Sequence, residues 1–240
     1  MLRQTIYVSS LCLWAVSAMA QDAGGPADAW SGSAELGATS TSGNTDTRNV
    51  NAKAEVLYEL DRWRHNLRGE ALFASDSGED TAERYVAAYQ ADAKLSPRSY
   101  LYGTVRGEVD KFSGYDYRLS EALGYGYRVW EAGDLGHLDL EGGPGARQSK
   151  PEDGAREEEA ILRLAAKYRH SWTATTRFSQ DFLVESGEDN TYAESVTGLK
   201  VRINSALAMK LSFTAKRNSE VPAGTKKTDT LSAVNLVYDF

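Results

Sequence analysis

The sequence predicts an all-β protein, an antiparallel transmembrane up-and-down β-barrel of about 12 strands. Three observations lead to this fold class. Apolar and polar residues alternate with a period of two along most of the chain, and turn-forming residues separate the alternating runs. The runs have about ten residues each, the length that a tilted strand needs to cross a bilayer. Links between the runs are expected to alternate between short and longer, as in outer-membrane barrels with both termini on one side.

The first twenty residues have the three regions of a secretory signal peptide. Arg3 supplies the positive charge, an apolar stretch follows, and Ala18-Met19-Ala20 is a small-x-small cleavage site. We therefore expect residues 1–20 to be removed on export. Residues 21–29 are predicted to form a flexible N-terminal segment, and residues 30–240 the barrel domain.

Each run is predicted to be a strand because one of its faces is apolar and the other is polar and often charged. In the first run, Trp30 and Leu36 lie opposite Ser33 and Glu35. The first seven runs cover residues 30–39, 49–60, 66–73, 84–95, 101–110, 117–129 and 138–141. Turn signals end the first four at Ser42-Gly43-Asn44, at Asp61-Arg62, in an acidic loop over residues 76–80 and at Ser96-Pro97.

A long polar loop is expected over residues 148–158, before the last five runs. These runs cover residues 160–169, 176–185, 194–203, 207–216 and 234–240. Residues 81–94 and 157–168 are rich in Ala and Glu and are also compatible with helices. We assign both segments to strands because the barrel would otherwise lose its even strand count.

Tryptophan positions support this arrangement. Trp14 lies in the expected signal peptide, whereas Trp30, Trp63, Trp130 and Trp172 fall at strand ends on the predicted periplasmic side. An amphipathic indole prefers the boundary between lipid and water. We therefore expect these four residues to form a periplasmic aromatic girdle.

The polar faces of the predicted strands carry charges of both signs. The candidate lumen-facing residues are Lys53, Glu55, Arg68, Glu70, Arg106, Glu108, Asp110, Asp139, Glu141, Arg163 and Lys167. They are compatible with a lumen tuned for small solutes or with an ion-pair network that fills the barrel. Glu121 breaks the pattern, because its position in the sixth run is lipid-facing.

Several motifs resemble those of one family. They are Trp30-x-Gly32, Glu35-Leu36-Gly37, Ser42-Gly43-Asn44-Thr45-Asp46, Asp110-x-Phe112-Ser113-Gly114, Gly124-Tyr125-Gly126-Tyr127 and Leu236-x-Tyr238-x-Phe240. Over nearly the whole mature chain, the sequence resembles the DUF481 family of YdiY-like, salt-induced outer-membrane proteins, whose function is unknown. The resemblance implies an outer-membrane location, and the family has no established substrate or catalytic residues to assign to this chain. Tyr238 and Phe240 also resemble the C-terminal assembly signal of outer-membrane barrels.

Composition excludes several classes of function. Without Arg3, the mature chain has 26 basic and 34 acidic residues, and this net charge of −8 opposes binding to nucleic acid. Cys12, the only cysteine, leaves with the signal peptide, which excludes disulfides, thiolate metal sites and cysteine nucleophiles. His65, His137 and His170 map to the periplasmic rim, away from the extracellular substrates of barrel hydrolases. We expect no cofactor, no metal and no enzymatic activity.

The sequence therefore favours a structural or envelope-stress role in the outer membrane of a Gram-negative-type envelope. Two alternatives stay open, a narrow porin-like channel for small solutes and an outer-membrane hydrolase. A count of twelve strands does not show whether the lumen is filled or open, since about 8 strands give a filled barrel and 16 to 18 leave an aqueous channel. The expected partners are outer-membrane lipid, lipopolysaccharide and, during biogenesis, the outer-membrane assembly machinery; the protein is expected to be a monomer.

Overall fold

The described part of the chain folds into one closed barrel. The computed structural model describes residues 29–41, 47–152, 154–221 and 225–240. The expected signal peptide and the turn at Ser42-Gly43-Asn44 lie outside these residues. Among the residues described, no helix has the length and apolar character needed to span a membrane.

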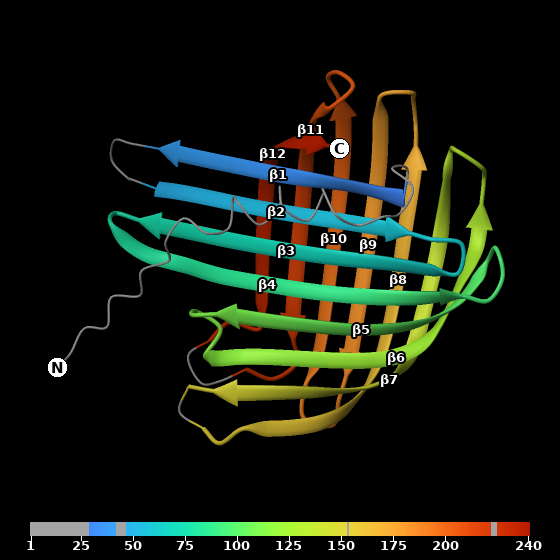
Figure 1. Cartoon of the computed structure of the whole chain (residues 1–240). Helices are drawn as coiled ribbons and strands as arrows, with labels where there is room; N and C mark the ends of the chain where they lie inside the picture. The colour runs from blue at the N-terminus through green and yellow to red at the C-terminus, as the bar shows by residue number, and fades with distance from the viewer. Residues whose placement is uncertain (1–28, 42–46, 153, 222–224) are drawn as a thin grey trace, which may run out of the picture.

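Twelve antiparallel strands form this barrel. They are β1 (Trp30–Thr41), β2 (Thr47–Glu59), β3 (Trp63–Asp76), β4 (Glu79–Lys94), β5 (Ser99–Asp110), β6 (Tyr115–Glu131), β7 (Gly136–Pro151), β8 (Glu157–Ser171), β9 (Thr176–Ser186), β10 (Thr191–Arg202), β11 (Leu207–Asn218) and β12 (Thr228–Asp239). Each strand pairs with the next, and β1 pairs with β12 to close the sheet. In Figure 1, β1 to β7 cross the front of the barrel, and β8 to β12 rise behind them at a steep angle. The predicted fold class is confirmed.

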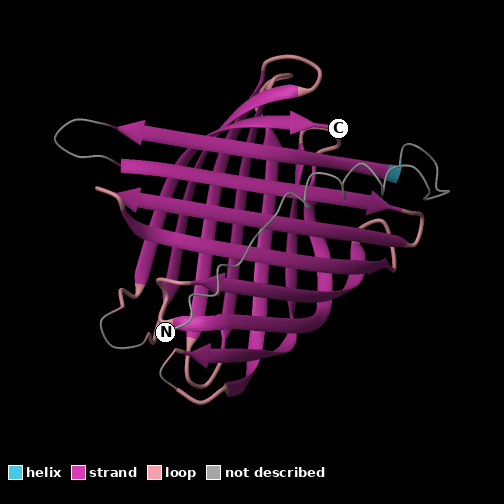
Figure 2. Ribbon diagram, turned by 60° about the vertical axis from the view of Figure 1, so that its left-hand side comes forward, coloured by secondary structure: helices cyan, strands magenta, loops and turns pink. Residues whose placement is uncertain are grey.

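The two ends of the barrel are named by what they carry. We call the end where β1 begins and β12 ends the terminal end, and the opposite one the loop end. Links at the terminal end cover residues 60–62, 95–98, 132–135, 172–175 and 203–206. Figure 2 shows that the connections lie at these two ends while the strands fill the wall between them.

Alternation along each strand separates an apolar outer face from a polar interior. On β6, Leu123 is 70% exposed on the outer face, whereas the neighbouring Ala122 is 5% exposed and points inward. The same contrast recurs along the other strands, where Leu, Val, Phe and Tyr side chains are the exposed ones. A water-soluble fold would bury these residues, whereas a barrel in lipid presents them to acyl chains.

The expected alternation of short and longer links is wrong in detail, because strands at the loop end continue beyond the predicted runs. The acidic loop over residues 76–80 is instead a two-residue hairpin turn, Ser77-Gly78, with φ values of 53° and 87°. Two consecutive residues with positive φ match the twist of paired strands and allow this tight connection. Similarly, β7 reaches Pro151 and β8 starts at Glu157, so the polar loop spans only residues 152–156.

The ladder that closes the barrel is short. Residue pairing between β1 and β12 covers Ser33–Leu36, and Gly32 and Phe240 exchange backbone hydrogen bonds of 2.8 and 3.0 Å. Inside this seam, Glu35 accepts hydrogen bonds from Lys210 at 2.7 Å and from Asn235 at 3.3 Å. Side chains from three strands thus supplement the few backbone bonds at the closure.

Candidate functional site: a lumen closed in one half

The eleven lumen candidates lie on the inner face and are buried or half-buried. The structure brings several of them together. Glu70 lies 3.9 Å from Lys53 and 3.5 Å from Arg68. Arg106 contacts Glu108 at 2.7 Å. These contacts connect side chains that alternate along one strand or face each other across two.

The other candidates form separate contacts. Glu141 is shared by Arg163 at 3.0 Å and Lys167 at 2.7 Å. Asp139 does not join that group and instead pairs with Arg128 at 2.7 Å. Asp110 reaches only the edge of ion-pair distance, 4.0 Å from Arg84. Glu55 forms no ion pair among the described residues, and it accepts a hydrogen bond from Asn66 at 2.7 Å.

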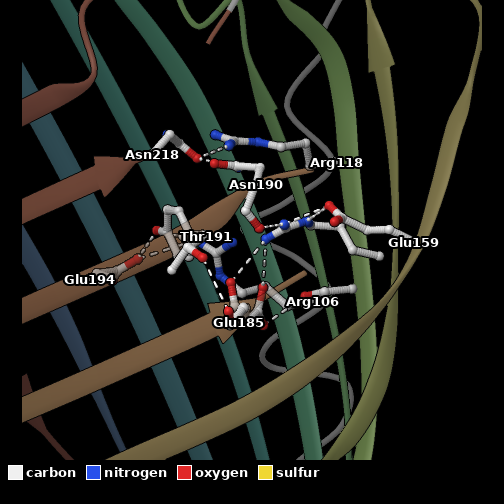
Figure 3. Close-up of polar contacts among 12 residues, drawn as sticks. Arg106, Arg118, Glu159, Glu185, Asn190, Thr191, Glu194 and Asn218 are labelled. Atoms are coloured by element: carbon white, nitrogen blue, oxygen red, sulfur yellow. Dashed lines mark hydrogen bonds and ion pairs between the residues drawn. The ribbon is translucent and has the colours of Figure 1, made fainter. Parts of the chain in front are cut away.

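Charged and aromatic side chains fill the lumen in the half nearest the loop end. We call this cluster the plug; its members are Arg84, Arg106, Glu108, Arg118, Ser120, Arg147, Glu159, Glu185, Asn190, Tyr192, Glu194, Lys216 and Asn218. Figure 3 shows part of it, where side chains from opposite walls meet in the middle of the barrel.

Several contacts in the plug join strands that are not neighbours in the sheet. Arg106 on β5 lies 3.4 Å from Glu194 on β10. Arg118 on β6 donates a hydrogen bond of 2.8 Å to Asn218 on β11. Ser120, also on β6, donates one of 3.1 Å to Glu185 on β9. β5 and β10, like β6 and β11, are five strands apart in the closed sheet of twelve, so their contacts span the lumen, whereas β6 and β9 are three strands apart and their contact cuts across one side of it.

Glu108 is the most connected acidic residue of the plug. Its side chain is 2% exposed, and its carboxylate lies 2.6 Å from Arg84, 2.7 Å from Arg106, 3.7 Å from Lys216 and 3.8 Å from Arg118. A buried carboxylate tolerates desolvation only when cations and hydrogen bonds surround it. Glu108 therefore holds four basic side chains inside the barrel.

Tyr192 fills the space between two of these basic side chains. The guanidinium groups of Arg106 and Arg118 lie 5.4 and 5.6 Å from the centre of its ring, within the range of cation–π interactions. Its hydroxyl donates a hydrogen bond to Glu194. The void left between Arg106, Arg118 and Tyr192 is about 10 Å³, which is room for about one water molecule.

The half nearest the terminal end is open by comparison. A cavity of about 720 Å³ extends from the rim turns, at residues 96–99 and 133–137, down to Arg106, Ser120 and Glu185 of the plug. Most ion pairs in this half join neighbouring strands, among them Arg64 with Asp92, Arg128 with Asp139 and Arg169 with Asp181, at 2.6 to 2.7 Å. These side chains lie along the wall. A few contacts join more distant strands, such as Lys200 with Asp239 at 2.6 Å and Gln90 with Lys167 at 3.3 Å, but a continuous cavity remains.

Glycines of β6 make room for two tyrosines on the inner wall. A Cβ atom at Gly124 would lie 2.6 Å from the Tyr102 hydroxyl, and one at Gly126 would lie 2.2 Å from the Tyr100 ring. The Tyr100 hydroxyl donates a hydrogen bond of 2.9 Å to Glu141. The alternation Gly124-Tyr125-Gly126-Tyr127 thus places side chains on the outer face only, because the inner face is already occupied.

The four tryptophans lie at the terminal end and are exposed on the outer surface. Two aromatic stacks continue from them, one joining Trp30 to Tyr58 with ring centres 4.3 Å apart and one joining Trp172 to Phe178 at 5.4 Å. Trp63 stacks on His65 at 6.0 Å, and Trp130 lies 6.0 Å from His170. That this belt meets a membrane interface stays a prediction.

The histidines do not gather into one site. His65 and His170 lie in the outer aromatic stacks, and His65 shares a hydrogen bond of 2.8 Å with Tyr89. His137 lines the cavity mouth, 3.9 Å from Asp139. Among the described residues, no three His, Cys, Asp or Glu side chains form a group that could hold a metal ion.

The C-terminal aromatic residues close the sheet at the same end. The Phe240 ring lies against Gly32, where a Cβ atom would be 2.4 Å from it, and stacks on Tyr238 with ring centres 6.1 Å apart. This contact explains why a small residue is needed in Trp30-x-Gly32. The role of Tyr238 and Phe240 as an assembly signal stays a prediction.

Comparison with known sequences identifies the family. The sequence profile described as "Protein of unknown function, DUF481" matches residues 34–240. The chain belongs to this family. YdiY of Escherichia coli K12, an uncharacterized protein, is 27% identical to this DUF481 protein over 208 residues, which cover 86% of this chain and 82% of YdiY.

Solved structures with similar folds are outer-membrane barrels. The translocator domain of the autotransporter NalP from Neisseria meningitidis has a TM-score of 0.51 at 14% identity, covering 95% of this chain and 93% of that one. The NanC porin has a TM-score of 0.51 at 9% identity, covering 87% and 97%. An outer membrane channel from Pseudomonas putida F1 has a TM-score of 0.50 at 14% identity, covering 90% and 99%. At these identities, the likeness concerns the fold alone.

Sequence reasoning missed several members of the plug. Arg84, Glu185 and Glu194 are polar-face residues of their predicted strands, but the alternation does not assign them to a cluster, and it assigns no role to Arg118, Arg147 and Tyr192. For Arg118, the alternation of inward and outward positions along β6 is the one feature of the sequence that indicates an inward side chain, because Ser120 two positions later also points inward. Parity does not reveal which residues meet across the lumen.

Proposed function

We propose that this DUF481 protein is a sealed outer-membrane barrel with a structural role in the envelope, including under salt stress, and with no catalytic activity. The observation that carries this proposal is the plug. Its charged side chains reach across the lumen from opposite walls, and the void between Arg106, Arg118 and Tyr192 holds about one water molecule. The scattered positions of His65, His137 and His170 support the absence of catalysis, because these side chains form no histidine-based catalytic group.

Opening the lumen would require several buried charges to lose their partners. Removing one partner from a buried ion pair typically costs about 3–5 kcal/mol. Arg106, Glu108 and Glu194 depend on one another, so their rearrangement would disturb more than one pair. The closed arrangement of the plug therefore has a much lower free energy than an open one.

The proposal includes a location and an orientation. The exposed apolar wall contacts outer-membrane lipid, the terminal end faces the periplasm and the loop end faces the lipopolysaccharide layer. The assembly machinery would recognise Tyr238 and Phe240 during insertion. Once folded, the barrel acts as a monomer, because closure leaves no extended strand edge for another copy.

Single-channel recording in planar bilayers tests the sealed lumen. We expect the refolded mature chain to give no discrete conductance steps in KCl. A variant with Arg106, Arg118 and Arg147 all changed to Ser should conduct, because Arg106 and Arg118 reach across the lumen and Arg147 fills the plug beside them. The matched control changes Arg64, Arg128 and Arg169 to Ser, which lie along the wall, and should stay silent.

All three proteins must first show heat-modifiable migration, the sign of a folded barrel. Discrete conductance steps from the unchanged protein would contradict the sealed-lumen proposal. They would favour the second candidate function, a narrow porin-like channel for small solutes. The cavity of about 720 Å³ is the observation in its favour, since half of the lumen is already open.

A further inference from the structure

Two arginines lie side by side at the floor of the cavity. Arg68 on β3 and Arg106 on β5 both pair in register with Ala88 on β4. Neighbouring strands are about 4.8 Å apart, so the two arginine backbones are separated by about 10 Å with only a methyl group between them. All three residues line the cavity.

Each arginine has a buried nitrogen without a hydrogen-bond partner. The Nε atoms of Arg68 and Arg106 have no acceptor among the described residues, although both atoms are shielded from solvent. Glu70 is 3.5 Å from Arg68 Nε, too far for a hydrogen bond. Buried N–H groups are nearly always satisfied, so two adjacent exceptions indicate that an acceptor belongs there.

The nearby carboxylates do not supply this acceptor. Glu108 and Glu194 both contact the Nη2 atom of Arg106 and leave its Nε free. Glu70 is shared by Lys53, Arg68 and Arg84 at 3.5 to 3.9 Å. The two guanidinium groups repel each other, and Glu70 and Glu194 offset part of this repulsion while leaving both Nε atoms without an acceptor.

We propose that Arg68 and Arg106 form a binding site for a carboxylate or phosphate group of a small, water-soluble anion that enters from the terminal end. Guanidinium groups suit both anions because they offer planar sets of N–H donors. A cavity of about 720 Å³ matches the size of ordinary small-molecule sites. This site goes beyond the proposed structural function, since binding does not depend on whether the plug conducts.

Isothermal titration calorimetry tests the site on the mature full-length barrel in a detergent without phosphate. The probes are citrate and pyrophosphate, with sucrose and spermidine as neutral and cationic comparisons. We expect saturable binding of at least one anion at one site per barrel, weakened by added KCl, and no binding of sucrose or spermidine. No heat from either anion, or equal binding of sucrose, would overturn the proposal.

Two variants place the binding at the arginines. Arg68→Gln removes one cation and should weaken anion binding about tenfold or more. Ala88→Leu keeps every charge but fills the gap between the arginines, and should weaken binding by a similar factor. The matched control is Arg48→Gln, which removes an exposed arginine from the outer face and should bind as the unchanged protein does.

The two variants test the site by different changes, one in charge and one in volume, so the test does not depend on both of them folding. If Arg68→Gln does not fold, Ala88→Leu still tests the site without changing a charge. Unchanged affinity in the folded variants would exclude the arginine pair. If phosphatidylglycerol added to the micelles abolishes citrate binding, the site belongs to a lipid headgroup and the water-soluble ligand is excluded.

Discussion

The two halves of the lumen use the same residue types in different geometry. Near the loop end, Arg106 reaches across from β5 to Glu194 on β10. Near the terminal end, Arg64 pairs with Asp92 on the adjacent strand, and Arg169 does the same with Asp181. Ion pairs between neighbouring strands lie along the wall, whereas contacts between distant strands fill the plug. The open half also has contacts between distant strands, such as Gln90 with Lys167 at 3.3 Å, but they leave a cavity of about 720 Å³. Partner position, more than charge content, therefore separates the two halves.

The inward side chains between the charges reinforce this difference. Near the loop end, the large ring of Tyr192 packs between basic side chains. The cavity wall carries smaller inward residues such as Ala88, Ala122 and Ala165, together with the ring of Tyr100, which lies against Gly126. A barrel of twelve strands lies between the sizes that side chains fill and the sizes that leave a water-filled channel. The volume of the inward side chains therefore decides whether each section of the lumen is filled or open.

The largest expected effect on stability comes from Glu108→Gln in the plug. This change leaves Arg84, Arg106, Arg118 and Lys216 without their shared carboxylate. The free energy of unfolding should fall by about 3–5 kcal/mol. Urea unfolding in micelles, followed by tryptophan fluorescence, measures the change; a loss below about 1 kcal/mol would mean that the plug is not a buried ion network.

A smaller effect is expected from Gly126→Ala on the inner wall of the open half. The new Cβ atom would displace the Tyr100 ring and its hydrogen bond to Glu141. Overpacking of this kind typically costs about 1–3 kcal/mol. Gly69→Ala is the control in the same assay, because a Cβ atom there meets nothing within 4 Å. Equal stability of the two variants would contradict the close packing of Tyr100.

The smallest effect is expected from Asp181→Asn at the terminal end. The Asp181 side chain is 30% exposed and contacts Arg169 alone at 2.6 Å. Solvent screens such a pair, so the loss should stay below about 1 kcal/mol and shrink further in KCl. If this variant proved as unstable as Glu108→Gln, the contrast between the two halves would be wrong.

Much of the fold was predictable from local pattern. Residues 81–94 and 157–168 have helix-favouring composition, yet they lie in β4 and β8, as their alternation requires. The error at residues 76–80 has a local cause, since the turn needs positive φ at Ser77 as well as at Gly78. A non-glycine residue rarely adopts that conformation, so nothing in the local residue pattern indicates so tight a turn there.

Sequence by itself determined the number of strands, their outward-facing apolar residues and the charged character of the interior. These properties follow from alternation, which depends only on neighbours along the chain. Tertiary structure decided that Arg106 meets Glu194, that Arg118 meets Asn218 and that Arg68 and Arg106 share the space beside Ala88. Barrel closure and strand stagger set those contacts, because they fix which residues from distant strands reach the same depth.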